Sequence, residues 1–160
     1  RRVAEVELEY EHWKQVPRTF KAWKWKYFSP REMACRGTGQ LKISSRLLDS
    51  LDLLRIRFDS SITILSAYRS PYHNSCVGGA VRSQHLFGDA CDISIRNKDK
   101  FLLEKLALEL KFTGFGYYNT FLHIDRRPKR ARWGRINWDC FNRGSYGCNR
   151  LCDREIVWLR

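Results

Sequence analysis

The sequence is organised around the stretch Ser83-Gln84-His85-Leu86-Phe87-Gly88-Asp89-Ala90-Cys91-Asp92, and a second segment, His123-Ile124-Asp125, follows it later in the chain. His85 and Asp92 stand seven residues apart with Gly88 between them, so a turn before a strand can bring both side chains to one point. Together with His123 they supply two imidazoles and a carboxylate, the ligand set from which open, catalytic zinc sites are built. The pattern predicts a metal site split between two segments.

The residues around these segments predict a single α+β domain with an antiparallel sheet and flanking helices. Leucines at helical spacing predict two amphipathic helices, and β-branched or apolar runs predict strands and a hairpin. The helices are expected near 45–57 and over 98–112, the strands over 61–68 and 90–95, and the hairpin over 114–125, while shorter helices should begin at Ser29-Pro30 and Ser70-Pro71. The alternating residues 23–28 indicate another strand or an extended arm.

Hydrolysis at such a site needs a proton acceptor and a positive group for the oxyanion or for an anionic end of the substrate. Asp125 lies two residues after His123 on the same face of the expected strand. Arg69 directly follows the strand expected over 61–68. Two roles fit Asp125 equally well: it could be the general base, or it could be a carboxylate that orients an imidazole. Arg69 is expected to clamp a substrate carboxylate, and Ser83 to contact substrate or to shape its loop.

The composition limits the classes of partner that the protein is expected to bind. Thirty Lys and Arg against seventeen Asp and Glu give a net charge of +13, which favours a polyanionic partner such as nucleic acid or bacterial cell wall. No stretch has the ~20 apolar residues of a membrane span, and the N-terminal residues alternate in charge instead of opening an apolar signal region. We therefore expect a soluble, monomeric protein without a visible signal peptide.

The cysteines do not predict a metal site of their own. No Cys-x-x-Cys pair occurs among the six, which excludes the spacing of a zinc ribbon. Structural or free thiols are expected, and pairing among those in the C-terminal tail stays open. The six are Cys35, Cys76, Cys91, Cys140, Cys148 and Cys152.

The residues resemble a known family. Ser83-x-His85-x-x-Gly88-x-Ala90-x-Asp92 matches the Ser-x-His-x-x-Gly-x-Ala-x-Asp signature of the zinc D-Ala-D-Ala carboxypeptidases and their relatives, within the group named for lysostaphin, D-Ala-D-Ala carboxypeptidase and sonic hedgehog. The resemblance extends from about residue 23 to Trp133-Gly134. It runs through Ser66-Ala67-Tyr68-Arg69-Ser70-Pro71, Gly114-Phe115-Gly116-Tyr117-Tyr118 and Phe121-Leu122-His123-Ile124-Asp125.

This resemblance implies a hedgehog/DD-peptidase-like fold with Zn²⁺ held by His85, Asp92 and His123. It also implies hydrolysis of peptide bonds in bacterial peptidoglycan, by a D,D-carboxypeptidase or endopeptidase of endolysin-like type, through attack of a zinc-bound water. By position, Arg69 resembles the family's substrate-contacting arginine. Many relatives carry an acidic base where this chain has Thr120, so Asp125 is the nearest replacement in the His-x-Asp branch that the chain resembles. Such an enzyme would act on the cell wall and be encoded by a phage or a bacterium.

The expected organisation is an N-terminal arm over residues 1–22, a catalytic domain over 23–134, and a basic, Cys-containing extension of the same domain over 135–160. Two other functions compete with the peptidase. The first is a non-catalytic, zinc-containing module that binds cell wall or protein, which Thr120 favours. The second is nucleic-acid binding by the tail after Arg126, where Trp133 and Trp138 alternate with arginines, although no recognised motif supports it.

Overall fold

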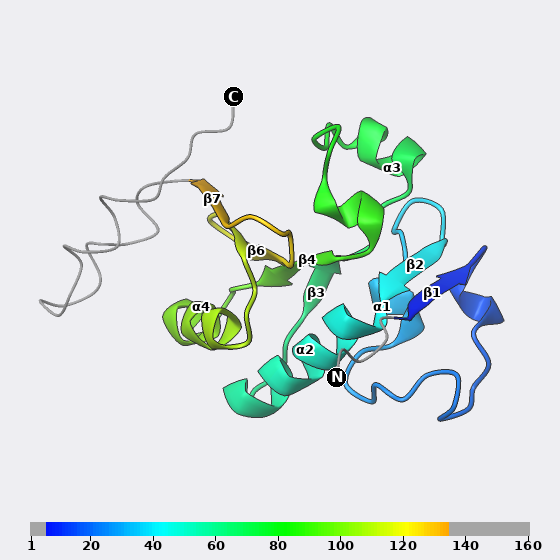
Figure 1. The fold of residues 1–160 in the computed structure, drawn as a ribbon, viewed down its shortest axis with the longest axis horizontal. Coiled ribbons are helices and arrows are strands. Elements are labelled where there is room, and N and C mark those ends of the chain that lie inside the picture. Colours follow the sequence, from blue (N-terminus) through cyan, green and yellow to red (C-terminus); the bar gives the residue numbers. More distant parts are fainter. Residues whose placement is uncertain (1–5, 135–160) are drawn as a thin grey trace, which may run out of the picture.

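The computed structural model describes residues 6–134, and its main element is a five-stranded sheet with the strand order β3-β4-β6-β5-β7 (Figure 1). The pairings are antiparallel except for the last, because β5 and β7 run parallel. The strands are β3 Ile64–Ser66, β4 Ala90–Ser94, β5 Gly114–Tyr117, β6 Phe121–Asp125 and β7 Ala131–Gly134. The predicted α+β class is confirmed, and the all-antiparallel sheet is corrected at β7.

Two helices cover one face of this sheet. In α2, Ser45–Phe58, the leucines Leu47, Leu51 and Leu54 are wholly buried, and α4, Lys100–Glu109, adds Leu103. They form one apolar core with the inward side chains of β4 and β6, which are Cys91, Ile93, Leu122 and Ile124. The opposite face of the sheet is left for polar side chains.

The ends of both helices follow their capping residues. Helix α2 begins where the Ser44 hydroxyl accepts a hydrogen bond from the Leu47 N–H at 3.0 Å, and it ends at Asp59, which adopts the left-handed conformation. Asp99 caps α4 in the same way, so this helix starts two residues later than its apolar pattern predicts. Both predicted helices are confirmed with small shifts of their ends.

The N-terminal part of the described chain forms a two-stranded sheet that the sequence did not predict. Strand β1, Glu7–Tyr10, pairs antiparallel with β2, Leu41–Ser44. Residues 23–28 form neither helix nor strand, so of the two alternatives the strand is wrong, and Trp25 and Phe28 pack this segment into the core. The remaining elements are η1 Trp13–Gln15, α1 Pro30–Met33, α3 Pro71–Cys76 and η2 Gln84–Phe87.

Three of the cysteines fall in the described part of the chain. Cys35 and Cys91 are buried and Cys76 is exposed, and all three are free thiols. The C-terminal extension over 135–160, with Cys140, Cys148, Cys152 and Trp138, lies outside the described residues. Within residues 6–134, no helix has the length and apolar character that crossing a membrane requires.

Candidate metal centre

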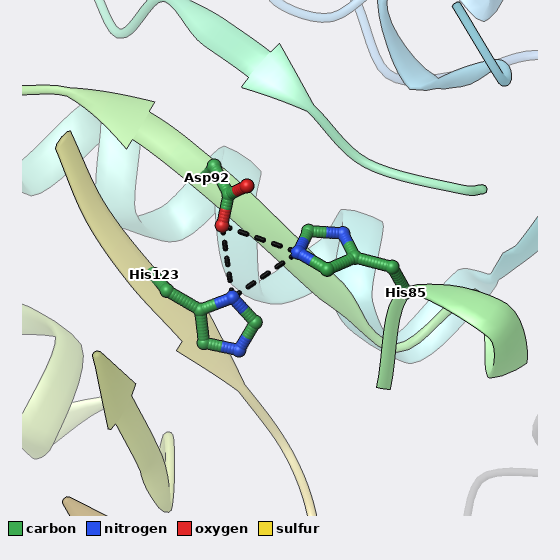
Figure 2. A group of neighbouring side chains, drawn as sticks. All are labelled: His85, Asp92 and His123. Carbon is green, nitrogen blue, oxygen red and sulfur yellow. Dashed lines mark hydrogen bonds and ion pairs between the residues drawn. The ribbon is translucent and has the colours of Figure 1, made fainter. Parts of the chain in front are cut away.

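Three side chains from η2, β4 and β6 meet on the face of the sheet opposite to α2 and α4 (Figure 2). Asp92 and His123 face each other across the β4–β6 pairing, and His85 reaches them from the short 3₁₀ helix before β4. The His85 Nε2 atom lies 3.1 Å from both Asp92 Oδ1 and His123 Nδ1, and these two atoms are 2.8 Å apart. One atom of each residue therefore points at a common centre.

The spacing of these atoms fits a small metal ion. Two ligands bound at 2.0–2.1 Å with tetrahedral angles are about 3.3 Å apart, close to the three observed separations. Exposure is 2% for His85, 5% for Asp92 and 6% for His123, so water satisfies little of their polarity. Two imidazole nitrogens and a carboxylate oxygen are the donors that zinc prefers.

The structure fixes the tautomer of His85. Its Nδ1 lies 2.5 Å from the backbone oxygen of Ala67, which can only accept a hydrogen bond. Nδ1 therefore carries the proton, and the lone pair of Nε2 faces the centre. The Ser83 hydroxyl accepts a hydrogen bond from the His85 N–H at 3.3 Å and caps η2, which is the loop-shaping role among the two expected for Ser83.

His123 carries its proton on the other ring nitrogen, Nε2. Its Nε2 lies 2.9 Å from Asp125 Oδ2, so an ionised Asp125 accepts the Nε2 proton and leaves the lone pair of Nδ1 toward the centre. Asp125 is wholly buried under the histidine, although the two residues are only two positions apart on β6. Of the two roles that the sequence left open for Asp125, this geometry is that of an orienting carboxylate.

The second carboxylate oxygen of Asp92 accepts a hydrogen bond from Arg69. The Nη2 atom of Arg69 donates to Asp92 Oδ2 at 2.8 Å, and its Nε donates to the Ser66 hydroxyl at 2.9 Å. A bulge in β3 between Ile64 and Ser66 brings Ser66 opposite Asp92 and so places this hydroxyl at the site. Arg69 therefore borders the centre, with 19% of its side chain exposed.

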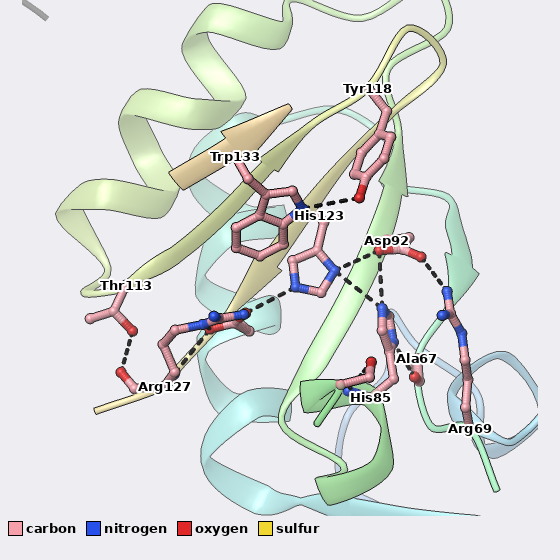
Figure 3. A network of polar contacts seen from close by, with 11 residues as sticks. Ala67, Arg69, His85, Asp92, Thr113, Tyr118, His123, Arg127 and Trp133 are labelled. Atoms are coloured by element: carbon pink, nitrogen blue, oxygen red, sulfur yellow. Dashed lines mark hydrogen bonds and ion pairs between the residues drawn. The ribbon is translucent and has the colours of Figure 1, made fainter. Parts of the chain in front are cut away.

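Two residues of the site were missed by the sequence interpretation. Arg127 binds Asp125 through Nε and Nη2, the latter at 2.6 Å from Oδ2, and its guanidinium lies 4.7 Å from the centre of the Trp133 ring (Figure 3). Trp133 also lies 5.0 Å from the His123 ring and donates to the Tyr118 hydroxyl at 3.0 Å. Both belong to the basic, aromatic segment that the nucleic-acid interpretation would place in contact with bases.

Small residues make room for these contacts. A Cβ at Gly114 would lie 2.1 Å from an Asp125 oxygen, and a Cβ at Gly116 would lie 2.8 Å from the Trp133 ring. Phe115, between the two glycines, points into the core instead. The Gly-Phe-Gly alternation thus follows from the two faces of β5, one apolar and one crowded by the site.

The charges of the site complement a cation. Burial would raise the pKa of Asp92, but the close contacts with both histidine rings hold that pKa well below its usual range. Burial lowers the pKa of His85. The pKa of His123 is raised despite similar burial, because the Asp125 and Asp92 carboxylates lie 2.9 and 2.8 Å from its two ring nitrogens. Asp125 has its pKa lowered to about 2, since His123 and Arg127 outweigh the effect of burial. Two carboxylates therefore stay ionised around two imidazoles.

Comparison with known proteins agrees with this centre. Residues 26–125 match the family described as Peptidase M15. No curated protein matches the chain. The matched segment includes the three residues that converge, and it also includes Arg69 and Asp125. Because it spans more than half of the sequence, the chain belongs to the peptidase M15 family.

Proposed function

We propose that this protein is a zinc metallopeptidase that hydrolyses peptide bonds in bacterial peptidoglycan, as an endolysin-like D,D-carboxypeptidase or endopeptidase. The observation that carries the proposal is the orientation of the three donors. Each of His85, Asp92 and His123 has its outer atom engaged by another group and its inner atom directed at one point. Metal-binding histidines in proteins are oriented in this way by outer hydrogen bonds.

Zinc bound by these three residues would supply Lewis acidity, which activates water and polarises a scissile carbonyl. Three protein ligands with a position left for water or substrate are typical of catalytic zinc, whereas structural zinc sites have four protein ligands. In the described part of the chain, no other group of His, Cys, Asp and Glu side chains shares this clustering. The donor set therefore favours a catalytic over a structural metal.

Arg69 is proposed as the substrate-contacting residue. Its guanidinium already compensates the outer oxygen of Asp92, and its partial exposure leaves it within reach of a substrate. Arginine presents several N–H donors in one plane and so can hold Asp92 while it binds a carboxylate or a developing oxyanion. Ser83 is proposed to act on the loop that carries His85, not on the substrate.

Asp125 is proposed to position His123 and not to remove a proton from water. Both of its oxygens accept hydrogen bonds from Arg127, and one also accepts from His123. A wholly buried carboxylate with these partners and a pKa of about 2 is a weak proton acceptor. The proton of the attacking water would then pass to another group.

The proposed activity is tested by mass spectrometry of peptidoglycan digests, made with the protein as purified, after chelation, and after zinc is restored. We expect new muropeptides that disappear with chelator and return with zinc, and their masses identify the bond that is cut. His85→Ala should abolish them, whereas His73→Ala, which changes a histidine outside the centre, should not. Zinc-loaded protein that releases no product from several peptidoglycan chemotypes would refute the proposal.

A second candidate is a non-catalytic, zinc-containing module that binds cell wall. Two observations favour it: Thr120 stands where many relatives carry their acidic base, and Asp125, the nearest replacement, is engaged by Arg127. The digests above separate the two functions when they are combined with co-sedimentation on purified walls. Binding of zinc-loaded protein to walls without any released muropeptide would support the module.

A further inference from the structure

A groove of about 750 Å³ opens at one end of β4 and β6. Its walls come from Leu65 on β3, from the end of β4, the start of α4 and the segment that joins them (residues 94–101), and from Asn119 and Thr120 in the turn before β6. None of the residues that line it takes part in the metal centre described above. The groove thus needs an explanation of its own.

The groove lies farther along β4 and β6 than the metal centre, at the end of these strands. Facing pairs on β4 and β6 place Asp92 opposite His123 and, two residues farther along, Ser94 opposite Phe121. Ser94 lines the groove and points to the same side of the sheet as Asp92. Two residues of a strand span about 7 Å, which is also the advance of two residues in an extended peptide. A peptide cut at the metal centre can therefore lay its second and following residues in the groove.

The charge of the groove is positive. Arg96, Lys98 and Lys100 line it, and Asp99 is the single carboxylate among its lining residues. Asp99 accepts a hydrogen bond from the Leu102 N–H as the cap of α4. Lys98 donates to the hydroxyls of Ser60 and Ser61, which are neutral and leave its charge uncompensated. The groove is built for an anionic group.

The groove also has an apolar part, formed by Leu65, Ile95 and Phe101. Leu65 is 44% exposed although it lies on a strand, since it points to the side opposite to the buried Ile64. An apolar wall beside cationic side chains matches a peptide whose small apolar residues alternate with carboxylates. A polymer with charge alone would leave the apolar wall unused.

We propose that this groove binds the carboxylate-bearing part of the peptide substrate and selects acidic over amidated stem peptides. The inference rests on the proposed function, because it assigns the groove to the substrate of the same metal centre. Arg96 and Lys100 are the specificity-determining residues, since both contribute charge to the groove without contacting the metal ligands.

The test is a pair of fluorescent stem peptides that differ at one group, a free D-glutamyl α-carboxylate in the first and its carboxamide in the second. Dissociation constants are measured by anisotropy with the zinc-loaded full chain. The wild type should bind the acidic peptide more tightly. The double variant Arg96→Glu/Lys100→Glu should weaken that binding about tenfold or more and change binding of the amidated peptide less than about twofold.

A matched control reverses the same number of charges elsewhere, at Lys21 and Lys105, which are exposed and do not line the groove. Lys21→Glu/Lys105→Glu should keep the preference for the acidic peptide. Equal losses in both double variants, or equal losses for both peptides, would overturn the proposal. Circular dichroism checks the fold of each variant, and amide shifts of residues 94–100 on titration with the acidic peptide should mark the groove.

Binding and hydrolysis are measured separately. Selective binding through Arg96 and Lys100 without release of muropeptides would support the groove and contradict the peptidase. Hydrolysis that does not distinguish the two peptides, with unchanged constants in the groove variant, would contradict the groove and leave the peptidase.

Discussion

At the level of single residues, the two histidines differ in what holds their outer nitrogens. His85 donates to a neutral backbone carbonyl, whereas His123 donates to an ionised carboxylate that Arg127 binds in turn. A carboxylate partner increases the electron density of the imidazole and makes it a stronger metal ligand. Of the two histidines, His123 is therefore the one whose orientation and basicity depend on a charged partner.

Replacing Asp125 by Asn should weaken the metal site and the fold together. The substitution leaves the Arg127 guanidinium without its buried carboxylate and removes the acceptor that fixes the His123 tautomer. We expect zinc affinity to fall about 10–100-fold and the metal-free protein to lose about 3 kcal/mol of stability. Competition with a chromophoric chelator and thermal unfolding measure these effects.

Asp59→Asn is the matched control for this change. Asp59 is exposed and ends α2 in the left-handed conformation, which Asn also tolerates. It should leave zinc affinity and stability nearly unchanged. Wild-type zinc affinity in Asp125→Asn would show that Asp125 does not position His123.

Zinc affinity should depend on pH through His123 and Asp125. A protonated imidazole has no lone pair, so zinc must displace the proton, and affinity declines as pH falls below the pKa of the histidine. Because the pKa of His123 is raised, this decline should begin above the ordinary value of about 6.5. In Asp125→Asn it should begin at a lower pH, since one of the two groups that raise the pKa is lost. Chelator competition between about pH 5.5 and 8 follows the shift; an identical onset in both proteins would contradict it.

At the level of elements, β5 has two glycines whose roles differ. The Cβ of an alanine at 114 would strike the Asp125 carboxylate, which Arg127 and β6 hold in place, whereas one at 116 would strike the Trp133 ring. Gly114→Ala should therefore reduce zinc affinity and stability. Gly116→Ala should mainly displace the indole and change tryptophan fluorescence while zinc is retained. Chelator competition and emission spectra of both variants test this contrast, and equal zinc loss in the two would refute it.

Elements with strong periodicity were predictable from the sequence, and the short strands β1, β2 and β7 were not. The leucine spacing of α2 and the apolar run of β4 each reflect burial of one element, so they are visible locally. Strands β1, β2 and β7 have four residues each and exist through their pairing partners. Strands β3 and β5 are no longer than these, but the apolar run over 61–68 and the polar turn of the hairpin over 114–125 indicated them.

The three residues that converge were predictable from the sequence, and the contacts around them were not. The signature spacing pointed to His85, Asp92 and His123, and the structure brings these three together. The contacts of Arg127 and Trp133 with the site gave no local signal, because they depend on how β7 returns beside β5. The arginines after β6 look like a solvated charge run until the buried Asp125 is placed beneath them.

At the level of the whole molecule, one face of the sheet is covered by helices and the other carries the candidate metal centre, while the groove lies at one end of β4 and β6. The face that carries the centre is thus formed mainly by strands and loops, where insertions and substitutions disturb the core least. This division lets the groove carry several cationic side chains without placing any of them in the apolar interior.

The net charge of +13 should act on the insoluble wall more than on soluble peptides. Attraction between many cationic groups and an extended anionic surface decays with the Debye length, which shortens from about 10 Å at 0.1 M salt to about 3 Å at 1 M. Co-sedimentation with purified walls should therefore weaken steeply over this range. Binding of the amidated stem peptide should change little, because it depends on short contacts in the groove and at the metal. A parallel loss of both would show that the charge acts within the site alone, and salt-independent binding to walls would show that it has no part in recognising them.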